Sequence, residues 1–131
     1  GIKIIEKKIS KEQDAPGIVT MKVTSDKAVG SISGTVLNGE KRIIAVDEYS
    51  IDLIPEGQVL ISFHRDRPGI VGEVGTLLGK NDINIAYMHL GRKAYQGEAL
   101  MALGIDEDVP EMILDEISKI KDISKAVFIK F

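Results

Sequence analysis

The sequence contains no cysteine and no tryptophan, and it has only two histidines in 131 residues. The absence of cysteine excludes disulfide bonds, thiolate nucleophiles and the strongest zinc ligands. It also fits a reducing cytosol, so we expect a cytoplasmic protein. The two histidines, His64 and His89, are far apart and do not show the spacing of metal ligands. We therefore expect no metal site.

Aromatic residues make up only 5% of the chain, and no apolar run approaches the roughly 20 residues that a membrane-spanning helix needs. The formal net charge is -3, and no long block of lysine and arginine is present. Such a charge pattern does not draw a protein to nucleic acid or to an anionic membrane. RNA-binding sheets also stack bases on aromatic side chains, which are scarce here. We therefore expect neither nucleic acid nor a membrane as a partner.

The chain has ample apolar sequence for a packed core, with 44% hydrophobic and 28% charged residues. Alternating apolar residues predict that residues 1–56 form a small β-rich, antiparallel domain. Asn38-Gly39 predicts a tight hairpin within it, because both central residues of a type I′ turn need a positive φ. Pro55-Glu56-Gly57 interrupts the pattern, so we place a domain boundary there and expect a second domain over residues 57–131. The strands expected in the first domain are residues 18–24, 31–37, 41–46 and 49–53.

Residues 57–131 alternate between strand and helix patterns. Apolar residues recur at helical spacing over residues 70–78 and 113–120, which predicts two amphipathic helices. We expect the first helix to begin around Asp66 to Pro68, with Asp66 capping its free N–H groups. Two helices covering one face of an antiparallel sheet give an α+β fold of the ferredoxin-like type. The order is βαββαβ, with strands expected at residues 59–63, 83–90, 99–105 and 126–131.

Charged side chains gather where the first of these strands meets its helix, in the segment His64-Arg65-Asp66-Arg67-Pro68-Gly69. Free backbone N–H groups and the positive end of the helix dipole converge at such a junction, which suits a carboxylate. Asp66 could supply negative charge for an ammonium group. Asn84, at the start of the next strand, has a donor and acceptors that could bind either group. Each of these residues could instead have a purely structural role. His64 would then be a strand-end histidine, Asp66 a helix cap and Asn84 part of a local turn.

Residues 57–131 also resemble an ACT domain, a small-molecule sensor attached to enzymes of amino-acid metabolism. The segments HRDRPG, INIA, GRK and GEALM carry this resemblance. Together with GTVLNGEKRI they are similar to the C-terminal regulatory region of the D-3-phosphoglycerate dehydrogenase family, most strongly from Ser31 to Pro110. The resemblance implies that residues 1–56 are the C-terminal part of the intervening domain, which precedes the ACT domain in the long form of that enzyme.

The resemblance implies an L-serine site. The serine contacts of the family fall on His64, Asp66 and Asn84. The serine-inhibited bacterial form carries asparagine at the middle position, whereas the carboxylate of Asp66 should favour the ammonium or hydroxyl group of serine. Gly69 lets the backbone approach a ligand closely. With two neighbouring residues included, the predicted serine site comprises His64, Arg65, Asp66, Gly69, Asn84 and Ile85.

The resemblance also implies partners. Members of the family pair their ACT domains side by side and bind serine between them, so we expect a homo-oligomer that binds L-serine or a similar small amino acid. The parent enzyme oxidises 3-phosphoglycerate with NAD, through catalytic domains upstream of this region. This chain has neither a GxGxxG motif nor catalytic residues, so we expect a regulatory region without a cofactor of its own. Arg42 alone matches a basic residue of the family's second, anion-binding site.

Two alternative interpretations stay open. The iron–sulfur L-serine dehydratase carries similar intervening and ACT domains in its β subunit or regulatory region, and upstream sequence would distinguish it from the dehydrogenase. The chain could instead be a ligand-free ACT module that serves only in assembly or dimerisation.

Overall fold

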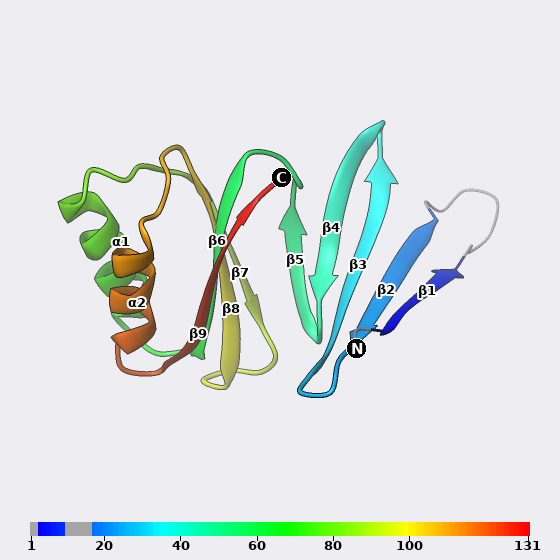
Figure 1. Ribbon diagram of the computed structural model, residues 1–131, viewed down its shortest axis with the longest axis horizontal. Coiled ribbons are helices and arrows are strands. Elements are labelled where there is room, and N and C mark those ends of the chain that lie inside the picture. The colour runs from blue at the N-terminus through cyan, green and yellow to red at the C-terminus, as the bar shows by residue number, and fades with distance from the viewer. Residues whose placement is uncertain (1–2, 10–16) are drawn as a thin grey trace. The chain divides into compact units, whose positions relative to one another are not determined.

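The structure is a computed structural model that describes residues 3–9, by their backbone, and residues 17–131. Two compact units divide the chain between Pro55 and Glu56. The first unit contains β1 to β5, and the second contains the other strands and both helices (Figure 1). The described elements are β1 (Lys3–Ile9), β2 (Ile18–Thr24), β3 (Val29–Leu37), β4 (Glu40–Val46), β5 (Tyr49–Leu53), β6 (Gln58–Arg65), α1 (Ile70–Lys80), β7 (Ile85–Arg92), β8 (Glu98–Ile105), α2 (Glu111–Lys119) and β9 (Ile123–Lys130).

The first unit is an antiparallel sheet in which the strands follow chain order from β1 to β5. β3 and β4 turn at Asn38 and Gly39, whose φ angles of 50° and 83° are positive, as the Asn-Gly pair predicts. The sequence pattern does not identify β1, because four of the seven residues in this strand are charged and interrupt its apolar alternation. β1 nevertheless pairs with β2 along its whole length.

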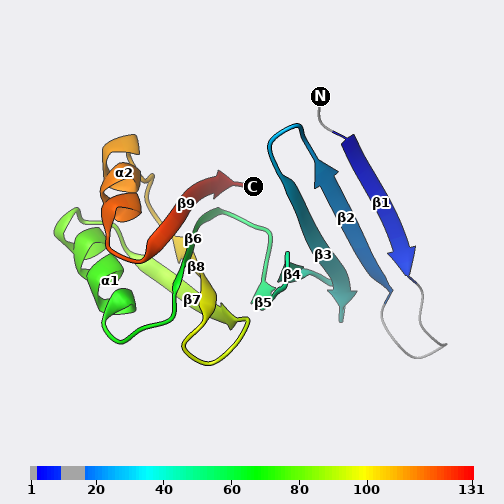
Figure 2. The same ribbon diagram turned by 90° about the horizontal axis from the view of Figure 1, so that it is seen from below.

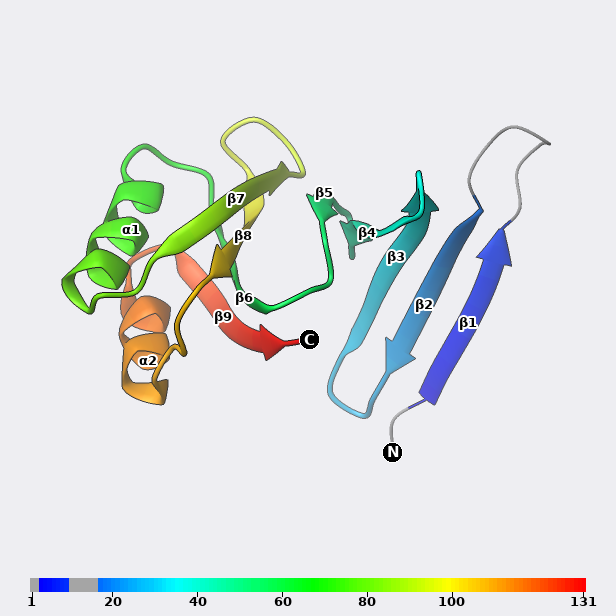
Figure 3. The ribbon, with the colours of Figure 1, turned by 90° about the horizontal axis from the view of Figure 1, so that it is seen from above.

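The second unit is an antiparallel sheet with the strand order β7-β8-β6-β9. Figures 2 and 3 show that α1 and α2 cover the same face of this sheet. The predicted α+β class and βαββαβ order are therefore confirmed. β7 begins at Ile85, slightly later than expected, and β9 begins at Ile123, slightly earlier.

The core of the second unit lies between its sheet and its two helices. Ile70, Val74 and Leu78 are buried at helical spacing along α1, and Ile113 and Ile117 are buried on α2. They belong to one apolar cluster with side chains of the sheet. Full burial of each such side chain contributes roughly 1.5–3 kcal/mol. This packing fixes the start of α1, and with it the loop from β6.

β7 is an edge strand, since the sheet order places β8 on one side of it and no described strand on the other. Met88 and Leu90, two residues apart on β7, are 44% and 48% exposed. An edge strand of this kind presents unpaired backbone N–H and C=O groups to a second strand. The predicted site residues lie near the two ends of β7, so a second strand paired with this edge would lie close to them.

Candidate functional site

His64 is the most buried of the predicted site residues, with an exposed fraction of 3%. It shares one face of β6 with the core residue Leu60, because side chains alternate along a strand. Burial lowers the pKa of His64 below 6.5, and the charge of Arg67 also lowers it, whereas the Ser62 backbone and Asp66 act in the opposite direction. Its Nδ1 atom is buried without a hydrogen-bond partner. Such atoms are uncommon in proteins, although the described residues contain four others.

The start of α1 has no side-chain cap. Gly69 is the N-cap residue, and its φ of 89° lies in the left-handed region that glycine enters at little cost. The prediction that Asp66 caps this helix is therefore wrong, because α1 begins only at Ile70 and the Asp66 carboxylate has a different partner. The first N–H groups of a helix lack acceptors within it, so an uncapped start favours binding of an anion.

Arg67 connects the β6–α1 loop to two other segments. Its Nε donates to Asp122 Oδ2 at 2.8 Å, and its Nη2 donates to the carbonyl of Lys121 at 2.9 Å, both just before β9. Its Nη1 donates to Glu73 Oε1 in the first turn of α1 at 2.8 Å. All three nitrogens of the guanidinium are thus committed to contacts within the chain. Arg67 therefore positions the loop.

A pocket of about 400 Å³ opens beside this loop. Asp66 lies in its wall, and its Oδ2 forms an ion pair with Nε of Arg92 at the end of β7, 3.1 Å away. Sequence reasoning does not include Arg92 in the site, although it belongs to the GRK segment. Arg65 belongs to the predicted serine site, but its side chain is exposed and it is not among the lining residues. The lining residues are Asp66, Arg67, Pro68, Gly69, Val71, Leu90, Arg92, Tyr95 and Gln96.

Asn84 and Ile85 lie at the opposite end of the sheet. Ile85 pairs with Ile105 of β8, whereas His64 pairs with Ala99 of the same strand. At about 3.4 Å per residue, these two positions on β8 are about 20 Å apart. A single chain therefore does not bring Asn84 to His64, and the predicted site residues fall into two separate groups.

Asn84 is exposed and is held by the loop that follows β8. Its Nδ2 donates to Asp106 Oδ2 at 2.6 Å, and its backbone N–H donates to Glu107 Oε2 at the same distance. These bonds fix one side of the carboxamide. Its oxygen and the second N–H of Nδ2 can still bind a ligand.

Comparison with known proteins identifies this second unit. A sequence model of the ACT domain matches residues 58–122, which run from the start of β6 to the residue before β9. The second unit is an ACT domain. Its ACT domain thus contains the junction of β6 with α1, the edge strand β7 and the loop that holds Asn84.

The ACT domain and the first unit together resemble one region of a larger enzyme. D-3-phosphoglycerate dehydrogenase of Synechocystis sp. is 42% identical over 131 residues, that of Methanocaldococcus jannaschii 40% over 130, and that of Bacillus subtilis 36% over 124. These alignments cover 99%, 98% and 94% of this chain and 24% of each relative. The chain is homologous to the C-terminal region of these enzymes and spans about a quarter of their length.

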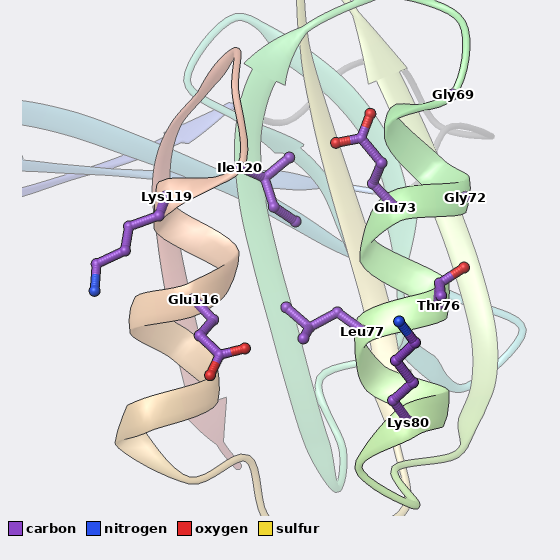
Figure 4. A pocket seen from close by; sticks show the side chains of 9 residues that line it. All are labelled: Gly69, Gly72, Glu73, Thr76, Leu77, Lys80, Glu116, Lys119 and Ile120. Atoms are coloured by element: carbon purple, nitrogen blue, oxygen red, sulfur yellow. The ribbon is translucent and has the colours of Figure 1, made fainter.

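A larger groove, of about 670 Å³, lies between the two helices of the ACT domain (Figure 4). Leu77 of α1 and Ile120, just after α2, point into it. Gly69 is the only predicted site residue in its lining, and Glu73 at its rim is bonded to Arg67. We therefore take the smaller pocket, with its Asp66–Arg92 pair, as the candidate site.

Arg42, the predicted anion-binding residue, lies on β4 of the first unit. Its Nη1 donates to Asp52 Oδ1 at 3.0 Å and its Nη2 donates to Glu40 Oε2 at 3.1 Å. An anion bound there would have to displace both carboxylates. We therefore leave Arg42 out of the function proposed below.

Two further properties bear on possible partners. Within residues 3–9 and 17–131, no helix has both the length and the apolar character needed to cross a bilayer. Over the same residues, His, Asp and Glu side chains do not gather in groups of three or more that could hold a metal ion.

Proposed function

We propose that this chain is the serine-sensing regulatory region of a D-3-phosphoglycerate dehydrogenase and that two copies together bind L-serine for feedback control. One observation carries the proposal. The pocket beside the β6–α1 loop and Asn84 lie at opposite ends of the same exposed edge strand, β7.

A second copy would close the distance between these two ends. In antiparallel pairing of two β7 strands about a two-fold axis, the start of one strand lies beside the end of the other. Asn84 and Ile85 of one chain then lie beside the pocket of the other, close to its Asp66 and Arg92. Each pair of chains has two equivalent sites, and neither site is complete in one chain. The position of β7 at the edge of the sheet supports this mode of pairing.

The chemistry of the pocket supports an amino acid as ligand. The uncapped start of α1 favours a carboxylate, and Asp66 favours an ammonium group. His64 Nδ1 is a buried polar atom next to the same loop.

In the parent protein, we place the catalytic domains, NAD and the oxidation of 3-phosphoglycerate outside these residues, and we expect a cytoplasmic location. The homology to dehydrogenases supports this parent over the iron–sulfur L-serine dehydratase. Serine binding and the state of the distant active site would then be coupled reciprocally.

Complementation between two variants tests whether the site is shared. His64→Ala and Asn84→Ala homodimers should each bind L-serine at least about tenfold more weakly, as measured by isothermal titration calorimetry. A heterodimer of the two variants, isolated with two different affinity tags, contains one intact site and one doubly altered site. It should bind about half as much serine as the wild-type dimer, with wild-type affinity.

Asn81→Ala is a matched control, since Asn81 is an exposed asparagine at the end of α1 and lies outside the site. It should leave serine affinity unchanged, and phosphate should give no saturable heat with any variant. If the wild-type chain does not bind serine, the assembly module becomes the better interpretation. If the heterodimer binds no better than the homodimers, the site is not shared between chains.

A further inference from the structure

We infer that Arg92 sets the specificity of the pocket by binding the carboxylate of an α-amino acid whose ammonium group binds Asp66. The inference rests on the proposed function, because it concerns the same pocket. It goes further by naming the residue that binds the carboxylate of this ligand and thereby selects a free α-amino acid over an amine without a carboxylate.

The geometry of Arg92 fits a carboxylate. Its Nε is the atom that pairs with Asp66 Oδ2, at 3.1 Å, and its side chain is 56% exposed. A guanidinium has five N–H groups, so pairing through Nε leaves the two terminal nitrogens for another acceptor. Two parallel N–H groups of arginine match the two oxygens of a carboxylate.

Of the two cationic side chains that line the pocket, Arg92 is the one with N–H groups left for a ligand. Arg67 is the other cationic side chain among the lining residues, and its three nitrogens are bonded to Asp122, Glu73 and Lys121. Redirecting Arg67 to a ligand would detach the loop from α1 and from the segment before β9. Redirecting the terminal nitrogens of Arg92 requires no such change.

The Asp66–Arg92 pair matches the charges of an α-amino acid. By itself the carboxylate of Asp66 would repel the carboxylate of serine. Arg92 offsets this repulsion and places a positive charge beside the negative one. The ammonium and carboxylate groups of an α-amino acid are attached to the same carbon, so each can face its opposite charge on this wall. An amine without a carboxylate leaves the terminal nitrogens of Arg92 without their acceptor.

The test compares two ligands and two variants of the 131-residue chain. L-Serinamide retains the ammonium and hydroxyl groups of L-serine but lacks the carboxylate. Arg92→Gln removes the guanidinium. Lys93→Gln is the matched control, because it removes one positive charge from the next residue and disrupts a Lys93–Glu98 ion pair that is also 3.1 Å long. Calorimetry gives the affinity of the wild type and of each variant for both ligands, and thermal unfolding verifies that the variants are folded.

The wild-type chain and Lys93→Gln should bind L-serine at least about tenfold more tightly than L-serinamide. In Arg92→Gln this preference should disappear, through weaker binding of serine alone, and Arg92→Lys should restore part of it. If Arg92→Gln keeps the preference for serine, the carboxylate binds elsewhere, such as the start of α1. The inference is then wrong, although the proposed function stands. An equal loss for both ligands would also overturn it. If the wild-type chain binds neither ligand, the proposed function fails and the inference fails with it.

Discussion

The two ends of the ACT sheet carry different chemistry. At one end, the Asp66–Arg92 pair lines a pocket next to an uncapped helix start, and His64 is buried without lining that pocket. At the other end, an exposed Asn84 is held by the carboxylates of Asp106 and Glu107. The difference teaches that a set of residues assigned to one site by family resemblance can be two half-sites. The edge strand β7 separates them in one chain, and its pairing with a second β7 would join them.

The largest effect is expected from a charge in the middle of β7. In Met88→Asp, two carboxylates would face each other near the two-fold axis, and like charges on paired strands repel. We expect loss of the dimer in sedimentation and serine binding at least about 100-fold weaker in calorimetry, because the half-sites separate. Met112→Asp changes an equally apolar, exposed residue on α2 and should leave both properties unchanged. Tight serine binding by a monomeric Met88→Asp chain would contradict the shared site.

A smaller effect is expected from protonation at the buried end of the sheet. Because burial lowers the pKa of His64, the unfolded chain binds a proton more readily than the folded chain below about pH 6.5. The free energy of unfolding should therefore fall as pH decreases below about 6.5, by at most about 1.4 kcal/mol per pH unit for this group.

Urea unfolding of the wild-type chain and of His64→Gln at pH 7.5 and pH 5.5 measures this contribution. The variant should lose less stability than the wild type on acidification. Carboxylates titrate in both proteins, so the difference between them isolates His64. Equal losses would show that burial does not disfavour the charged imidazole.

The smallest effect is expected at the exposed end. Asp106→Asn weakens the hydrogen bond that orients the Asn84 carboxamide, and it should reduce serine affinity about two- to threefold, which corresponds to roughly 0.5 kcal/mol. Asp108→Asn is the matched control, since Asp108 pairs with Lys130 instead. An equal change in both variants would indicate a general effect of charge rather than orientation of Asn84.

The order of elements in the ACT domain could be predicted from the sequence, because the apolar stripes of α1 and α2 and the intervening strands have distinct periods. The residue at which α1 starts could not be predicted in the same way. Aspartate is a good cap in general, but here Gly69 takes a left-handed conformation and Asp66 pairs with Arg92 across the sheet. A partner from a distant strand outweighs the local preference.

The candidate site could be predicted only in part. His64, Asp66 and Gly69 are neighbours in sequence and in space, so a motif finds them together. Arg92 joins them only through the register of β7 on β8. The 20 Å between Asn84 and His64 likewise follows from strand register, which a motif does not contain.

The three bonds of Arg67 have a consequence for how a ligand enters. The β6–α1 loop is already fastened to the start of α1 and to the segment before β9. Little conformational entropy remains for a ligand to remove, so binding there should follow diffusion rather than the slow closure of a lid. The same hydrogen bonds couple the loop to its neighbours, so a shift that a ligand imposes on the loop must also move the beginnings of α1 and β9.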